Sequence, residues 1–149
     1  MKDFSYQIIS ETFTENQLMT LLSLYTTIFD SPDIDFFKNR IKTKENVFAV
    51  VAFEEENPIG FKIGYRYNQE TMYSWVGGVL ETHRKFGIGQ KLMELQHKTA
   101  KNQGYKKART KSMNAFKPMM ILNLKNGFNI INVYTNAVNQ TKIVFEKQL

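Results

Sequence analysis

The stretch Arg84-Lys85-Phe86-Gly87-Ile88-Gly89-Gln90 has the residue types and spacing of a site that could bind an anion. Two glycines two residues apart let the backbone approach a ligand closely. A helical pattern follows, and the first N–H groups of a helix have no partner within it. With the partial positive charge of a helix N-terminus, these groups suit a phosphate. The turn is neither a Walker loop nor a G-x-G-x-x-G fingerprint.

Composition restricts the other chemistry that the chain could perform. Its 149 residues include no cysteine, which excludes disulfides and thiolate zinc sites, and only two histidines. His83 and His97 are too far apart for a metal pair on one helix, so we expect no metal. The net charge of +6 suits a phosphorylated cofactor, nucleic acid or a membrane surface. We expect a cytoplasmic protein, although the absence of cysteine also permits other compartments. The sequence shows no signal peptide and no apolar run that could span a bilayer, so we expect no membrane contact.

Two helices are predicted early in the chain. Thr14 and Gln17 have the spacing of a capping box, and apolar residues recur at helical spacing over residues 18–29. Ser31 and Pro32 predict the N-cap and first turn of a second helix.

Strand patterns occupy the segments around these helices. Residues 6–9 predict a short first strand, and residues 47–53, 59–67 and 72–79 predict an antiparallel meander. Gly77 and Gly78 interrupt the last of these strands. Paired glycines in a strand indicate a bulge, a close approach by another molecule, or a packing kink without a ligand.

The predicted helix after the turn runs from Ile88 to a stop at Gly104. Residues 107–111 then predict a strand, and a strand, helix and strand in succession should place the two strands parallel. Pro118 opens a short helix that Gly127 closes. A final hairpin of residues 129–135 and 142–145 completes one predicted α+β domain over residues 1–149.

Two of these segments resemble the GNAT superfamily of acyl-CoA-dependent N-acyltransferases. The turn has the form R-x-x-G-x-G, and residues 114–128 carry the pattern P-M-x-x-x-N-x-x-x-G-F from Pro118 to Phe128. The order of elements is similar over nearly the whole chain. The resemblance implies an α+β, three-layer fold with a mixed, mostly antiparallel sheet of about seven strands. It also implies a central parallel splayed pair and about four flanking helices.

The resemblance implies acetyl-CoA as co-substrate. In the family, the turn binds the pyrophosphate through backbone N–H groups, and the preceding strand end pairs with the pantetheine arm. An N–H group at or near Val79 would polarise the thioester carbonyl. The cofactor-binding residues that this implies are Gly77, Gly78, Val79, Arg84, Lys85, Phe86, Gly87, Ile88, Gly89, Gln90, Asn114 and Asn123.

The chain departs from the family pattern at several positions. Asn123 stands where many members have a tyrosine that protonates the leaving thiolate, and an amide is not an acid near neutral pH. Phe116 stands where asparagine is common, and Asn114 is a candidate for the lost contact. Lys85 and Phe86 replace a commoner glycine and basic residue, which a site built from backbone tolerates.

The catalytic groups are left open by the sequence. Asn123, Tyr134 and Glu81 are candidates, and a water held by backbone could replace Glu81 as the base. Trp75, Tyr73 and Tyr65 are candidates for the acceptor pocket. The two tyrosines and Tyr134 are also candidate acids, although aromatic residues of this kind are more often core or pocket wall, and Trp75 could equally be a core residue.

The implied function is an N-acetyltransferase that moves an acetyl group from acetyl-CoA to a primary amine by direct attack in a ternary complex. The acceptor could be a small molecule or a peptide, the acyl group could be longer, and a homodimer is common in the family. One alternative is a non-catalytic acyl-CoA-binding protein, which Asn123 favours. Another is a basic nucleic-acid-binding module, although the sequence has no recognition-helix or RNP-type motif.

Overall fold

The computed structural model describes residues 2–149, which form seven strands and four α-helices. The strands are β1 (Phe4–Ile9), β2 (Phe48–Glu54), β3 (Asn57–Arg66), β4 (Thr71–Val79), β5 (Lys107–Met113), β6 (Asn129–Thr135) and β7 (Thr141–Gln148). The helices are α1 (Glu15–Ile28), α2 (Ile34–Thr43), α3 (Ile88–Asn102) and α4 (Lys117–Lys125), with short 3₁₀ turns η1 (Glu81–His83) and η2 (Asn114–Phe116).

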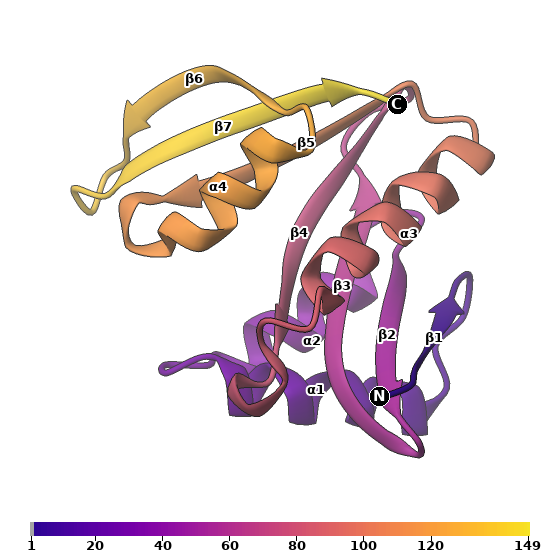
Figure 1. Ribbon diagram of the computed structural model, residues 1–149. Helices are drawn as coiled ribbons and strands as arrows, with labels where there is room; N and C mark the ends of the chain where they lie inside the picture. The colour runs from indigo at the N-terminus through magenta and orange to yellow at the C-terminus, as the bar shows by residue number, and fades with distance from the viewer. Residues whose placement is uncertain (1) are drawn as a thin grey trace.

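All seven strands belong to one sheet with the order β1-β2-β3-β4-β5-β7-β6. Neighbouring strands are antiparallel except for β4 and β5, which are parallel. Helices α1 and α2 cover one face of the sheet, whereas α3 and α4 lie on the other (Figure 1). The predicted α+β fold and its central parallel pair are therefore confirmed.

The hydrophobic core lies on both faces of the sheet. Leu21 and Phe37 from α1 and α2 pack against Phe61 of β3 on one face. On the other face, Leu92 and Met93 of α3 are buried with residues of the sheet. Both faces of the central strands are covered, which explains the long apolar runs in their sequences.

The first two helices begin at side chains that cap their free N–H groups. Thr14 and Gln17 form the predicted capping box, with the Gln17 N–H 3.1 Å from Thr14 Oγ1. The prediction of Ser31 as the second N-cap is wrong, because Asp33 takes that position. Its carboxylate accepts the Phe36 N–H at 3.0 Å, so the helix begins two residues later than Ser31 and Pro32 suggest.

The parallel pair separates part-way along its length. Pairing of β4 with β5 runs from Thr71 opposite Lys107 to Ser74 opposite Thr110. There the Thr110 hydroxyl donates a hydrogen bond of 2.9 Å to the Ser74 carbonyl. Beyond this point β4 pairs only with β3, and β5 only with β7, so the two strands diverge (Figure 1). The edge of β4 from Trp75 to Val79 is left without a neighbour on that side.

Close packing inside the protein accounts for the two glycines of β4. A Cβ at position 77 would lie 2.7 Å from the carbonyl oxygen of Phe61, and one at position 78 would lie 2.9 Å from Cγ2 of Ile28. The register with β3 is regular at both glycines and shifts instead at Ile63/Gly64. These contacts explain why both positions are glycine, and the bulge of this strand pair lies at Ile63/Gly64 instead.

Candidate functional site

The turn before α3 has a backbone that requires glycine at one position. Gly87 is the N-cap of α3 and has a left-handed φ of 78°, and a Cβ there would meet no atom within 4 Å. Conformation, not space, therefore selects glycine at position 87. Lys85 also has a positive φ, of 72°, although it has a side chain. Gly89 lies in the first helical turn, where a Cβ would make an ordinary contact of 3.8 Å with Leu122.

Successive backbone N–H groups of this turn have no partner. Among residues 2–149, no acceptor is found for the N–H groups of residues 85–90, whereas those of His83 and Arg84 bond to the preceding turn. The N–H of Lys91 then begins the helical pattern by donating to the Gly87 carbonyl at 3.1 Å. The turn thus has the free donors and the helix N-terminus that a phosphate group needs.

Side chains attach this turn to the sheet. Arg84 Nε donates to the carbonyl of Val79 at 3.3 Å, which ties the turn to the end of β4. Phe86 lies against Phe4 with ring centroids 5.9 Å apart, so its side chain points toward β1. A ligand at the turn would therefore meet the backbone of Phe86 rather than its ring.

His83 fastens the same segment to β2. Its Nε2 lies 3.0 Å from Glu54 Oε1, and its Nδ1 lies 2.8 Å from the Thr82 hydroxyl. The hydrogen bond from His83 lowers the pKa of the Glu54 carboxyl. Both ring nitrogens are thus occupied, which gives His83 a positioning role rather than a free catalytic nitrogen.

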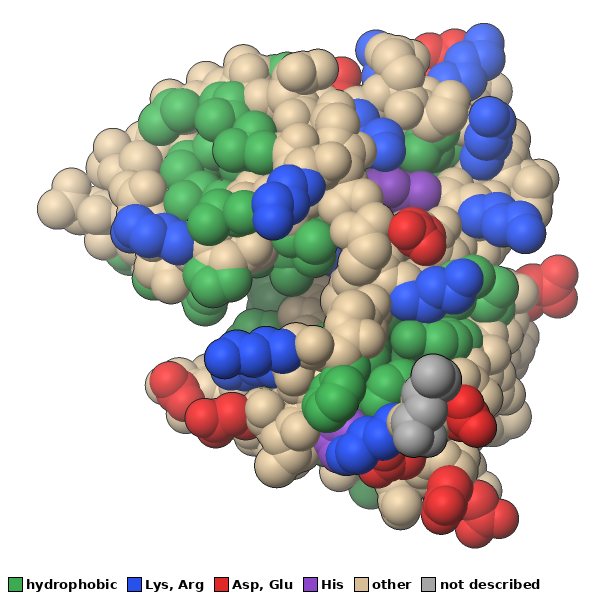
Figure 2. All heavy atoms as spheres, in the orientation of Figure 1, with side chains coloured by type: hydrophobic (Ala, Val, Ile, Leu, Met, Phe, Trp, Pro, Cys, Tyr) green, Lys and Arg blue, Asp and Glu red, His purple; other side chains and the backbone are tan. Residues whose placement is uncertain are grey.

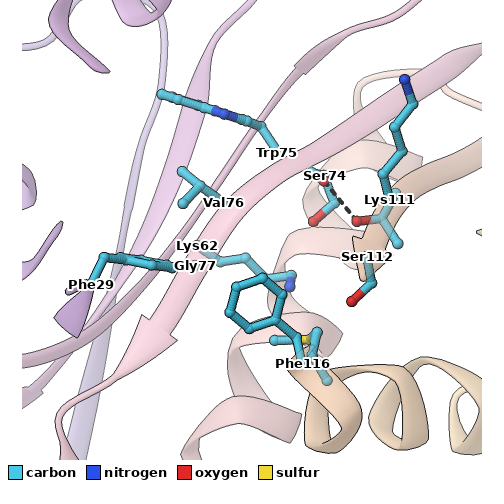
Figure 3. A pocket seen from close by; sticks show the side chains of 11 residues that line it. Phe29, Lys62, Ser74, Trp75, Val76, Gly77, Lys111, Ser112 and Phe116 are labelled. Carbon is cyan, nitrogen blue, oxygen red and sulfur yellow. Dashed lines mark hydrogen bonds between the residues drawn. The ribbon is translucent and has the colours of Figure 1, made fainter. Parts of the chain in front are cut away.

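A pocket of about 170 Å³ opens where β4 and β5 diverge (Figure 3). Its lining comes from the C-cap of α1, from β3 to β5, from η2 and from the start of α4: Phe29, Lys62, Ser74, Trp75, Val76, Gly77, Thr110, Lys111, Ser112, Phe116 and Met119. The surface view shows a hollow with hydrophobic walls on one side of the molecule (Figure 2). Lysine or arginine side chains lie beside this hollow.

Lys62 lines this pocket, and the sequence analysis did not identify it as a site residue. Its side chain passes Gly77 and runs toward Phe116 (Figure 3), and only 8% of the residue is exposed. Burial lowers the pKa of Lys62 to about 8. No ion pair or hydrogen bond of its ammonium group is found among residues 2–149. A lysine between Gly60 and Gly64, inside an apolar strand, is a signal in the sequence that could have identified it.

Several buried polar atoms on α3 and α4 lack partners. Within the described residues these are Nε2 and Oε1 of Gln96, Nε2 of His97 and Nδ2 of Asn123. Burial, followed by the charges of Lys147 and Lys62, lowers the pKa of His97 to about 3, so the ring is neutral. The His97 ring packs against Phe128, with ring centroids 5.4 Å apart.

Asn123 and Asn114 lie in different surroundings. Asn123 is 1% exposed, and its backbone carbonyl accepts the Phe128 N–H at 3.1 Å. Its side-chain Nδ2 is buried and has no partner among residues 2–149, so it is a free donor. Asn114 is exposed in η2, where its carbonyl accepts Lys117 Nζ at 2.8 Å.

The predicted acceptor and catalytic residues separate into two groups. Trp75 lines the pocket between the strands, whereas Tyr65 and Tyr73 line a second pocket beside it. Burial raises the pKa of Tyr73 to about 12, so its hydroxyl stays protonated. Glu81 is exposed in η1, and Tyr134 lies on β6; neither lines either pocket.

In residues 2–149, no group of three or more histidine, cysteine, aspartate or glutamate side chains is placed to hold a metal ion. Over the same residues, no helix has the length and apolar character needed to cross a bilayer.

Comparison with protein families gives one match over much of the chain. The family model described as the acetyltransferase (GNAT) family matches residues 7–120. A search among curated proteins finds no match.

Several solved structures share the fold over nearly the full chain at low sequence identity. The ribosomal-protein-S18-alanine N-acetyltransferase from Escherichia coli has a TM-score of 0.80 and 13% identity, with 97% of this chain and 94% of that chain covered. A GNAT family acetyltransferase from Elizabethkingia anophelis, with acetyl-CoA bound, has a TM-score of 0.75 and 20% identity over 97% and 98%. NAA60 of Arabidopsis thaliana in complex with acetyl-CoA has a TM-score of 0.77 and 17% identity over 99% of each chain.

Proposed function

The chain belongs to the GNAT family of acetyltransferases, and we propose that it transfers an acetyl group from acetyl-CoA to a primary amine. The observation that carries the proposal is a spatial one. The unpaired edge of β4 leads directly into the turn whose N–H groups of residues 85–90 lack partners. One extended ligand with amides at one end and phosphates at the other would satisfy both. Transfer is by direct attack of the amine in a ternary complex.

The residues present fit coenzyme A. The turn offers backbone donors to a pyrophosphate, with Arg84 and Lys85 adding charge. The free edge from Trp75 to Val79 offers backbone groups to the pantetheine amides, as an added strand would. Two structures of the same fold hold acetyl-CoA, which supports this assignment.

Lys62 is the group that we expect to stabilise the departing sulfur. Asn123 supplies no acid at the usual tyrosine position, and a thiolate leaving group needs a proton or a positive charge. The Lys62 ammonium has no carboxylate partner among the described residues and reaches the pocket between β4 and β5. Its lowered pKa makes proton donation near neutral pH easier than for an ordinary lysine.

Cofactor binding is tested first by calorimetric titration of coenzyme A. Gly89→Trp should abolish binding, because the new side chain would cover the donors of the turn. Lys101→Trp, an exposed position at the other end of α3, is the matched control. Equal affinity of the wild type and Gly89→Trp for coenzyme A would contradict the proposed cofactor site.

Turnover is tested separately, because Asn123 also suits a protein that holds acyl-CoA without reaction. Release of free thiol from acetyl-CoA in the presence of primary amines should exceed release without amine. Coenzyme A binding without amine-dependent thiol release would favour the non-catalytic alternative. Salt-sensitive binding to nucleic acid that coenzyme A does not displace would favour the basic module.

Three expectations from the sequence stay predictions. One N-acetyltransferase domain over residues 1–149 agrees with the single sheet to which all strands of residues 2–149 belong. A homodimer is to be tested by light scattering, and a cytoplasmic location by imaging of the tagged protein in its own cell.

A further inference from the structure

A second pocket, of about 270 Å³, adjoins the one between β4 and β5. Lys111 lines both pockets, and Tyr73 of the second is the chain neighbour of Ser74 in the first. The rings of Tyr65 in the second and Trp75 in the first have centroids 6.2 Å apart. A single molecule could therefore occupy both pockets at once.

The second pocket carries positive charge without carboxylates of its own. Four of its lining residues are cationic, and no aspartate or glutamate lines it: the cations are Arg40, Lys44, Arg66 and Lys111. None of the four takes part in an ion pair found among residues 2–149. The nearby Arg109 differs, because Glu146 lies 2.9 Å from its guanidinium group and neutralises it.

Aromatic rings hold these cations in place. Nη1 of Arg40 donates to the Tyr65 hydroxyl at 3.0 Å, and its guanidinium carbon lies 4.5 Å from the Phe36 ring centroid and 5.5 Å from that of Trp75. Lys44 Nζ lies 5.4 Å from the Tyr65 ring centroid. A guanidinium fixed in this way loses little freedom when it binds an anion.

We propose that the second pocket binds a carboxylate or phosphate group of the acceptor, so that the acceptor is an amine that also carries an anionic group. This inference rests on the proposed function, because it assigns the amine to the neighbouring pocket. Arg40 and Lys44 would contact the anion, while the tyrosine rings would cover the linking part of the acceptor. Charge-assisted hydrogen bonds of this kind distinguish an anion from its neutral analogue.

Matched pairs of amines test this preference. A tripeptide with a free C-terminal carboxylate is compared with its C-terminal amide, and phosphoethanolamine with ethanolamine. Binding to the protein is measured by titration, and acetylation by thiol release. The anionic member of at least one pair should bind about tenfold more tightly, and added salt should reduce that difference. The pair with the larger difference tells whether the anion is a carboxylate or a phosphate.

Variants then assign the preference to the pocket. Lys44→Gln and Arg40→Gln should each weaken binding of the anionic amine and leave its neutral analogue and coenzyme A unchanged. Lys38→Gln removes an exposed charge from the same helix outside the pocket, and it should change nothing. Lys44 is exposed, so its variant remains informative even if Arg40→Gln disturbs packing.

The outcomes separate this inference from the proposed function. Equal binding of the two members of every pair would overturn the anionic acceptor, even if amines are acetylated. A preference that survives in Lys44→Gln and Arg40→Gln would overturn the assignment to this pocket. If the wild-type protein neither binds coenzyme A nor releases thiol from acetyl-CoA, the proposed function itself is overturned.

Discussion

The side chain of Lys62 lies against the backbone of Gly77, so that a Cβ at position 77 would be 3.0 Å from Lys62 Cγ. The same Cβ would lie 2.7 Å from the Phe61 carbonyl oxygen, which is backbone and moves little. Gly77→Ala should therefore displace both β4 and Lys62 and lower the free energy of unfolding by about 1–3 kcal/mol. Urea denaturation measures this. Gly89→Ala, where contacts are ordinary, should be neutral or stabilising.

Lys62 should reduce stability at neutral pH because its charged form is buried. The pKa falls from 10.5 to about 8 on folding, so the unfolded chain binds the proton more strongly. The penalty is present below pH 8 and is relieved as pH rises from about 8 toward 10.5. Lys62→Met should stabilise the protein by about 3 kcal/mol at pH 7, and by less at pH 9. A gain that does not vary with pH would contradict this origin.

The same substitution should have the opposite effect on turnover. If Lys62 assists the leaving sulfur, Lys62→Met should lower kcat by about a hundredfold and leave coenzyme A binding unchanged. The kcat of the wild type should fall as Lys62 loses its proton above its pKa of about 8. The kcat of the variant should not show that fall. Lys62→Arg should retain charge and part of the activity. Unchanged kcat in Lys62→Met would remove Lys62 from the chemistry.

Substitution of Lys85 tests whether the turn binds coenzyme A through its backbone N–H groups. Its φ of 72° is unfavourable for a residue with a side chain, so Lys85→Gly should relieve strain of about 1 kcal/mol. Affinity for coenzyme A should fall little, because the N–H group stays in place. Lys91→Gly removes the same charge within α3, where glycine should cost about 1 kcal/mol. A large loss of affinity in Lys85→Gly would show that the charge matters more than the backbone.

The order of elements could be predicted from the sequence because it depends on local patterns. The strand around Ala108 and its parallel partner followed from the strand-helix-strand order, and both are present. Asp33 was missed as an N-cap because Ser31 and Pro32 make an equally good local signal. Local signals alone do not decide between competing caps.

The chemistry of the pockets could be predicted less well, since it depends on residues that converge from different elements. The Lys62 side chain lies beside Gly77 of β4, and side chains of α3 lie close to Gly60 and Gly64 on either side of Lys62. The cationic pocket brings Arg40 of α2 together with Lys111 of β5. Contacts between residues far apart in the sequence leave no pattern of spacing within either segment.

The separation of β4 from β5 also has a consequence for motion. Within the sheet of residues 2–149, the first four strands pair with the last three through the register from Thr71 opposite Lys107 to Ser74 opposite Thr110. Amide hydrogens along this short seam should exchange sooner than those of the β2–β3 pair, because fewer hydrogen bonds must open together. A ligand that bridges the gap would slow that exchange and raise the melting temperature by mass action. The substrate would thus complete the cooperative structure of the sheet that binds it.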